Sequence, residues 1–104
     1  MKFKRWELWL ARVAYEDQPN VCKKRPVIVY SETECFTLSF KVSSQNPHTY
    51  RENYELQMWR EAGLDKPSFI SLNPVRIKIE DMLFKIGKLH LLDIQKINTL
   101  LDNK

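Results

Sequence analysis

Three consecutive cations stand directly before a proline and a run of β-forming residues. Lys23, Lys24 and Arg25 precede Pro26, and the apolar run 27–30 follows. The planar guanidinium of an arginine donates two parallel hydrogen bonds to a phosphate, and the fixed φ of the following proline helps to aim it. The same charges also fit a simpler role, in which they guard an aggregation-prone strand. The pattern alone leaves both interpretations open.

A second group of polar side chains stands where another strand is expected to end. Ser43, Ser44 and Gln45 close an alternating apolar pattern, and His48 follows in a polar loop. A serine hydroxyl at a strand end is able to reach a bound phosphate, and an unperturbed histidine exchanges protons near neutral pH. From the pattern alone, an ordinary exposed serine and a surface histidine explain these residues better.

The composition describes one small domain, over residues 1–104, with a modest positive charge. The net charge is +4, with nine Lys or Arg against five Asp or Glu in residues 1–51 and eight of each in residues 52–104. The excess lies in the half with the three cations, which favours a polyanionic partner without proving one. Apolar stretches are too short to span a membrane, and charges interrupt the basic N-terminus, so no signal peptide is expected.

The cysteines and histidines do not form a metal-binding pattern. Cys22 and Cys35 lie thirteen residues apart, and His48 and His90 are far apart in sequence. Two cysteines are too few for a disulfide scaffold, and they lack the paired spacing of zinc ligands. We therefore expect no metal, no other cofactor, and two reduced thiols in a cytoplasmic protein.

The elements expected to position these residues are mostly short strands. Residues 6–15 read as a strand and 16–24 as a loop, and Pro26 is expected to begin the next strand because a first residue needs no ladder N–H. The run 27–30 is typical of a strand covered on both faces. The clearest period-two pattern covers 36–44, with aromatic and aliphatic residues on one face and polar ones on the other.

The second half of the chain is expected to continue with short strands and to end in a helix. Strand-like pieces lie at 54–59, before a turn that Gly63 ends, within 67–81, and at 82–89, where Gly87 is expected to loosen the strand. Many short strands with little helix predict a mainly β protein, a compact barrel closed by the last helix. The helical spacing that predicts this amphipathic helix is formed by Leu91, Ile94, Ile97 and Leu101.

Several of these stretches together resemble the MazF/PemK (Kid) family of toxin endoribonucleases. The matching stretches, which cover nearly the whole chain, are "ELWLARV", "KKRPVIVYS", "VSSQ", "WREAGLDKPS" and "KIGKLHLLDIQKI". The resemblance implies a small SH3-like β-barrel that forms a homodimer and cleaves single-stranded RNA at specific sequences without a metal. It also implies a cognate antitoxin protein, whose disordered tail lies across the RNA site.

The resemblance further implies roles for individual residues. Arg25 matches the family's catalytic arginine, which stabilises charge on the phosphoryl oxygens and secondarily donates a proton to the leaving 5′-oxygen. Ser43 stands where the family commonly has threonine, so the hydroxyl is kept while the methyl that restricts its rotamer is lost. Trp6 stands where family members usually have glycine. The expected RNA contacts come from Lys23, Lys24, Ser44, Gln45 and His48.

Two other functions remain open on the sequence. A non-enzymatic relative with the same barrel, such as a gyrase poison of the CcdB type, depends on an apolar, aromatic-containing C-terminal tail, whereas this chain ends "LLDNK". A catalytically weakened regulator that binds nucleic acid is compatible with the serine at position 43. Cleavage of RNA in the presence of EDTA is the observation that separates the ribonuclease from both alternatives.

Overall fold

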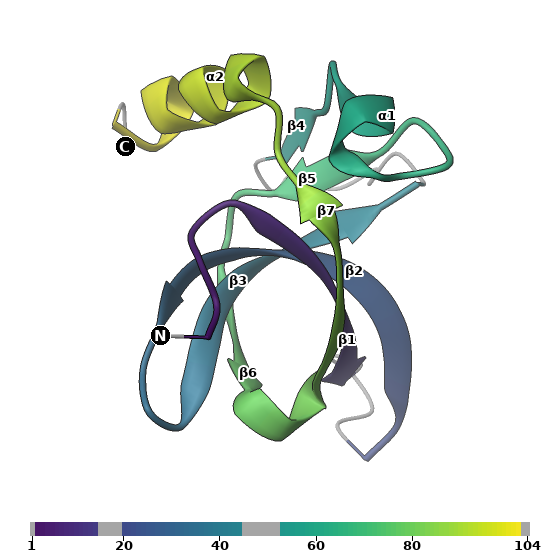
Figure 1. Ribbon diagram of the computed structural model, residues 1–104, viewed down its shortest axis with the longest axis vertical. Helices are drawn as coiled ribbons and strands as arrows, with labels where there is room; N and C mark the ends of the chain where they lie inside the picture. Colours follow the sequence, from purple (N-terminus) through teal and green to yellow (C-terminus); the bar gives the residue numbers. More distant parts are fainter. Residues whose placement is uncertain (1, 15–19, 45–52, 103–104) are drawn as a thin grey trace.

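A computed structural model describes residues 2–14, 20–44 and 53–102. These residues form mainly antiparallel β-structure, with one short helix and one longer helix at the C-terminal end (Figure 1). None of the helices described is long and apolar enough to cross a membrane. The elements are β1 (Glu7–Ala14), β2 (Cys22–Glu32), β3 (Phe36–Ser43), β4 (Asn53–Glu55), α1 (Trp59–Ala62), β5 (Phe69–Ser71), β6 (Val75–Lys78), the 3-10 turn η1 (Ile79–Asp81), β7 (Met82–Lys88) and α2 (Leu91–Asp102).

The strands form one strongly curved sheet in the order β4-β5-β3-β2-β1-β7, and β6 also pairs with β3 (Figure 1). Among the strands described, β6 pairs with β3 alone and β7 with β1 alone, so no ladder closes the sheet into a barrel. The turn η1 connects β6, which pairs with β3, to β7, which pairs with β1. The two strands therefore lie on different edges of the curved sheet and do not pair with each other. The expected barrel closed by the last helix is therefore wrong, whereas the mainly β class is confirmed.

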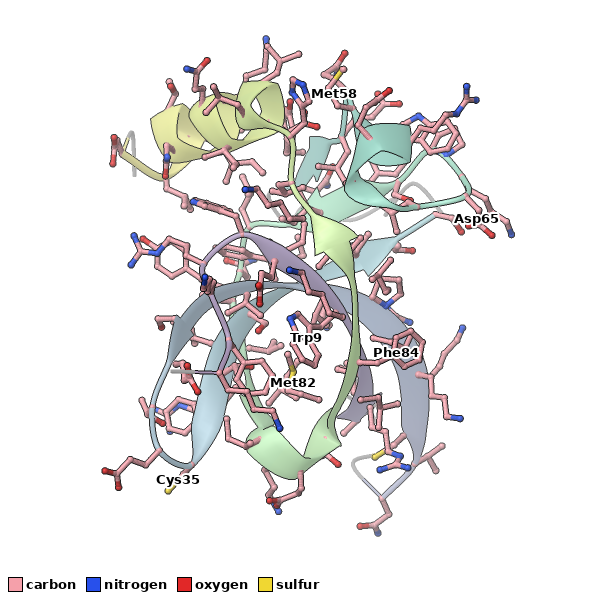
Figure 2. The ribbon with its side chains drawn as sticks, in the orientation of Figure 1. Trp9, Cys35, Met58, Asp65, Met82 and Phe84 are labelled. Carbon is pink, nitrogen blue, oxygen red and sulfur yellow. The ribbon has the colours of Figure 1, made fainter. Side chains whose placement is uncertain are left out.

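The sheet carries a buried core on each face. Val27 and Val29 belong to an enclosed core inside the curve of the sheet, and Ile28 belongs to a helix-side core next to α1 and α2. All three side chains are fully buried, which confirms a strand covered on both faces. Trp9 and Met82 point into the enclosed core (Figure 2). The buried members of the enclosed core are Phe3, Ala11, Val27, Val29, Ile77 and Met82.

The alternation predicted for β3 is present, but much of its polar face is buried. Thr37 and Ser39 are fully buried. Their hydroxyls share a 2.9 Å hydrogen bond, and Thr37 Oγ1 also donates to the sulfur of Met82 over 3.6 Å. Buried hydroxyls need such partners, and the curl of the sheet brings them together. Only toward the end of the strand does this polar face open to solvent, at half-buried Ser43.

The strand that carries the three cations begins earlier than predicted. It starts at Cys22, so Pro26 is its fifth residue rather than its first. This first part of β2 pairs with β1 alone, because the ladder to β3 ends at Val27. On such an edge a missing N–H on the open side removes no ladder bond, which is why proline is tolerated inside the strand. The predicted loop over 16–24 is therefore wrong for its last three residues.

The predicted C-terminal helix is confirmed as α2, but its apolar stripe is only partly right. Ile97 is fully buried, and Ile94 and Leu101 pack against the helix-side core. Leu91, expected in the same stripe, is 63% exposed. The helix starts at this residue, and its first turn is rotated so that Asp93 faces inward instead.

Asp93 is a fully buried carboxylate that fastens α2 to β4 and to the residues that follow it. It accepts hydrogen bonds from the hydroxyl of Tyr54 at 2.6 Å and from the backbone amides of Gln57 and Met58 at 3.0 and 2.9 Å. Burial, followed by the hydrogen bond to Asp93 and its charge, raises the pKa of Tyr54. The carboxylate therefore serves as a shared acceptor for three donors of the neighbouring chain segment.

Three backbone positions depend on a special conformation or a close approach. Gly63 ends α1 at a φ of 107°, as predicted. Gly87 lies beside a register shift in the β1–β7 ladder, as expected for a loosened strand. A Cβ there would lie 2.1 Å from the carbonyl oxygen of Ala62, so the glycine also lets α1 pack on β7. Trp6 has a φ of 73°, a left-handed conformation that glycine, the residue usual at this place in the resembled family, adopts without strain.

Candidate functional site

The site begins where two neighbouring strands diverge. β2 and β3 are paired as far as Val27 and Lys41. Beyond this pair β2 continues along β1, whereas Val42 and Ser43 pair with Ile70 and Phe69 of β5. The two strands therefore separate like the arms of a fork, which leaves space between them where the β2–β3 ladder ends.

This fork holds an open pocket of about 250 Å³. Continuing the last β2–β3 register across the fork places Arg25 opposite Ser43 and Lys24 opposite Ser44. The structure thus brings together five of the seven residues predicted for the site, from two stretches that are distant in sequence. Gln45 and His48 lie outside the described residues. The pocket is lined by Lys23, Lys24, Arg25, Pro26, Val42, Ser43 and Ser44.

The position of Arg25 is set by the buried part of its own strand. Side chains alternate along a strand, so Arg25 shares the inner face with Val27 and Val29, which are fixed in the enclosed core. Its cross-strand partner is Ala11, a small side chain that leaves room for it. Arg25 is half-buried, whereas Lys23 and Lys24 are exposed. The strand therefore holds one cation at the rim of the pocket and two in solvent around it.

The lining of the pocket suits an anion with several oxygen atoms. A guanidinium and two ammonium groups supply positive charge, and two serine hydroxyls supply neutral hydrogen-bond donors. No described carboxylate forms an ion pair with Lys23, Lys24 or Arg25. Partial burial strengthens the interaction of Arg25 with an anion relative to a fully solvated side chain. A phosphate diester matches this set of donors.

Sequence reasoning missed the contribution of β1 to this region. Arg12 is exposed and pairs directly with Lys24 across the β1–β2 ladder, so the two cations lie on one face of the sheet. The only signal in the sequence was the basic residue itself, since antiparallel register is not readable before the turn between the strands is known. The cationic surface is therefore wider than the segment 23–25.

A second open pocket, of about 260 Å³, surrounds α1 and is lined by residues 57–61. It carries one cation and one carboxylate, Arg60 and Glu61, and Arg60 lies 5.0 Å over the ring of Trp59. Among the described residues no group of three His, Cys, Asp or Glu side chains lies close enough together to hold a metal ion. Of these two pockets, the one between β2 and β3 is the stronger candidate, because it concentrates charge of one sign.

A scan of the chain against models of known protein families finds no match, and a search among curated proteins finds no significant relative. The function proposed below is accordingly based on the pocket and on the resemblance of the short stretches described above.

Proposed function

We propose that this chain is the toxin of a toxin–antitoxin pair, a metal-independent endoribonuclease that cleaves single-stranded RNA at specific sequences. The observation that carries the proposal is the pocket that Arg25 and Ser43 both line. The resemblance had paired these two residues in one site although they lie eighteen positions apart in sequence. The pocket lining supplies donors that such a reaction uses, namely one guanidinium, two ammonium groups and two hydroxyls.

In the proposed reaction the ribose 2′-hydroxyl loses its proton to solvent and its oxygen attacks the adjacent phosphorus. The bond to the 5′-oxygen of the next nucleotide breaks, and that oxygen takes up a proton. The upstream fragment then ends in a 2′,3′-cyclic phosphate and the downstream fragment in a 5′-hydroxyl. Arg25 stabilises the charge that grows on the non-bridging oxygens and donates toward the leaving 5′-oxygen. Ser43 donates a hydrogen bond to a phosphoryl oxygen and forms no covalent bond. Lys23 and Lys24 hold the neighbouring phosphates.

The proposal includes a homodimer of SH3-like subunits and an antitoxin that covers the pocket. Apolar side chains exposed along α2, at Leu91, Leu92 and Leu100, offer a surface for self-association. We expect a dimer at micromolar concentration, and sedimentation of a monomer there would remove this part of the proposal. An antitoxin segment that occupies the cationic pocket is expected to compete with RNA.

The test is incubation of the purified protein with a mixed single-stranded RNA in EDTA, followed by mapping of the cut ends. We expect cuts at a recurring short sequence, with cyclic phosphate upstream and 5′-hydroxyl downstream. An Arg25→Ala preparation, purified in parallel, controls for a contaminating nuclease. Uncut RNA would contradict the enzymatic proposal, and 5′-phosphate ends would mean attack by water, which removes the roles given to Arg25 and Ser43.

A further inference from the structure

A row of apolar side chains crosses three strands on the outer face of the sheet, which is the face turned away from the enclosed core. Leu10 of β1 pairs with Pro26 of β2 on one side and with Phe84 of β7 on the other. Cross-strand partners lie on the same face, so the three side chains are neighbours. Phe84 lies on the opposite side of β7 from Trp9 and Met82 (Figure 2). It is 57% exposed, which is unusual for so large an apolar side chain.

A pair of cations lies next to this row. Arg12 lies two residues after Leu10, and Lys24 lies two residues before Pro26. Side chains alternate along a strand, so both cations occupy the same outer face as the row. Both are exposed, and they stand directly opposite each other across the ladder. Like charges in this arrangement destabilise a sheet, and an anionic ligand lying over them relieves the repulsion.

The outer face is continuous with the candidate pocket. Lys24 and Pro26 line the pocket and also belong to the outer pair and the outer row. Neighbouring strands lie about 4.8 Å apart, so Phe84 is roughly 10 Å from Pro26 across the sheet. A polyanion that leaves the pocket over β2 therefore meets two cations and then an exposed aromatic ring.

We propose that Phe84 and Arg12 form a flanking platform for single-stranded RNA. The inference rests on the proposed function and adds residues that the resemblance did not supply. The Phe84 ring stacks on a base next to the cleavage site, and Arg12, with Lys24, contacts the phosphates on either side of it. Stacking on an aromatic ring tolerates any base, so this platform contributes affinity and leaves sequence choice to other contacts. Phe84 and Arg12 are positioning residues that do not touch the reacting phosphate.

The test uses a fluorescent single-stranded RNA of mixed sequence in which 2′-O-methyl groups block the nucleophile. Phe84→Leu keeps an apolar side chain but removes the aromatic face, and we expect binding about 5- to 30-fold weaker. Phe84→Tyr keeps the ring and is expected to bind within about twofold of wild type. In cleavage assays Phe84→Leu raises KM by a similar factor with kcat unchanged, because the lost contact serves substrate and transition state equally.

The charge is tested separately by the salt dependence of binding. Each phosphate contact on a single strand contributes about 0.7 to the slope of log Kd against log salt, so Arg12→Gln should lower that slope by about this amount. Lys78→Gln is the matched control, because Lys78 is exposed on β6, which pairs with the opposite end of β3 from Ser43. We expect its slope to equal that of wild type.

The outcomes separate this inference from the proposed function. If the wild-type protein cleaves RNA and both variants, Phe84→Leu and Arg12→Gln, bind RNA as tightly as wild type, the platform is excluded. The proposed ribonuclease function is then unaffected. Wild-type protein that neither binds nor cleaves RNA overturns both. A Phe84→Leu variant that keeps its RNA affinity but no longer self-associates assigns this face to a second copy of the chain, which also overturns the platform.

Discussion

Two regions of this molecule, the helix end around Asp93 and the fork between β2 and β3, use their polar side chains in opposite ways. At the helix end, Asp93 is fully buried and each of its three hydrogen bonds has a short, defined distance. At the fork between β2 and β3, the cations are exposed or half-buried. The β2–β3 ladder ends there at Val27 and Lys41, although both strands continue. The helix end therefore supports stability, whereas the fork contributes little to it and remains available to a ligand. Variants in the two regions should change different properties.

The largest expected effect is on activity, from Arg25→Ala. Removing the guanidinium takes away the main stabilisation of charge on the phosphate, and we expect RNA cleavage to fall by about 10³-fold or more. The urea unfolding midpoint should change little, because Arg25 lines an open pocket and forms no ion pair with a described carboxylate. Lys78→Gln, which removes a cation far from the pocket, is the control for net charge. A wild-type cleavage rate in Arg25→Ala would contradict the assignment.

The next effect is on stability, from Asp93→Ala in the helix region. Three hydrogen-bond donors lose their shared, fully buried acceptor, and we expect the free energy of unfolding to fall by about 3 kcal/mol, measured in urea. Tyr54→Phe, which removes one of the three bonds and leaves the charge with two donors, should cost about 1 kcal/mol. The cleavage rate per folded molecule should not change in either variant. A large loss of cleavage in fully folded Asp93→Ala would show that the two regions are coupled.

The fold was predictable from the sequence to the level of its elements. Apolar alternation located β1 and β3, and the continuous run after Pro26 located a strand buried on both faces. The apolar stripe predicted for the helix was wrong at Leu91, because helical spacing does not show which side of the first turn faces the rest of the protein. The buried carboxylate of Asp93 was not predicted. The prediction of a closed barrel was wrong because the pairing of β6 and β7 depends on the curvature of the whole sheet, which no local sequence pattern encodes.

The candidate site was predictable as two separate segments but not as a surface. The residues around Arg25 and those around Ser43 were found by type and by resemblance, and the register of β2 and β3 then brought them together. Arg12 and Phe84 were missed because their relation to Lys24 and Pro26 runs across the β1 ladders. Such cross-strand neighbours are set by register, and a shift of one residue would move each of them to the other face.

A smaller effect on activity is expected from Ser43. A preorganised hydrogen-bond donor at the transition state is typically worth about 10²–10³ in rate. Serine lacks the methyl group that restricts the rotamer of a threonine hydroxyl, so Ser43→Ala should slow cleavage by roughly 10- to 100-fold. Ser43→Thr should keep or raise the rate, because the added methyl restricts the rotamer of the hydroxyl. Single-turnover rates at saturating protein measure this, and equal rates for Ser43→Ala and wild type would exclude the hydroxyl from the reaction.

The smallest effect concerns Glu7 on β1, the strand that runs from the helix end to the fork. Its buried carboxylate accepts hydrogen bonds from the Lys4 amide and the Trp9 indole at 3.0 Å, and it lies 3.1 Å from Lys85 Nζ. Burial by itself would raise the pKa of Glu7, but the Lys4 amide, the Trp9 indole and the Lys85 charge together lower it from its ordinary value of 4.5. A carboxyl whose pKa is lowered by folding stabilises the protein above its unfolded pKa. That contribution is lost as the pH falls through the folded pKa.

Glu7→Gln should therefore be less stable than wild type at pH 7, by about 1 kcal/mol, since half-exposed Lys85 contributes little of the interaction. The difference should shrink as the pH falls below 4.5, because a protonated Glu7 is uncharged, like the glutamine that replaces it in the variant. Urea unfolding at pH 7 and in mild acid measures this, with Glu80→Gln at an exposed carboxylate of η1 as the control. A difference that stays constant across this range would mean that Glu7 acts through its shape and neutral hydrogen bonds. Cleavage should be unaffected at neutral pH, because Glu7 faces Lys85 and not the pocket.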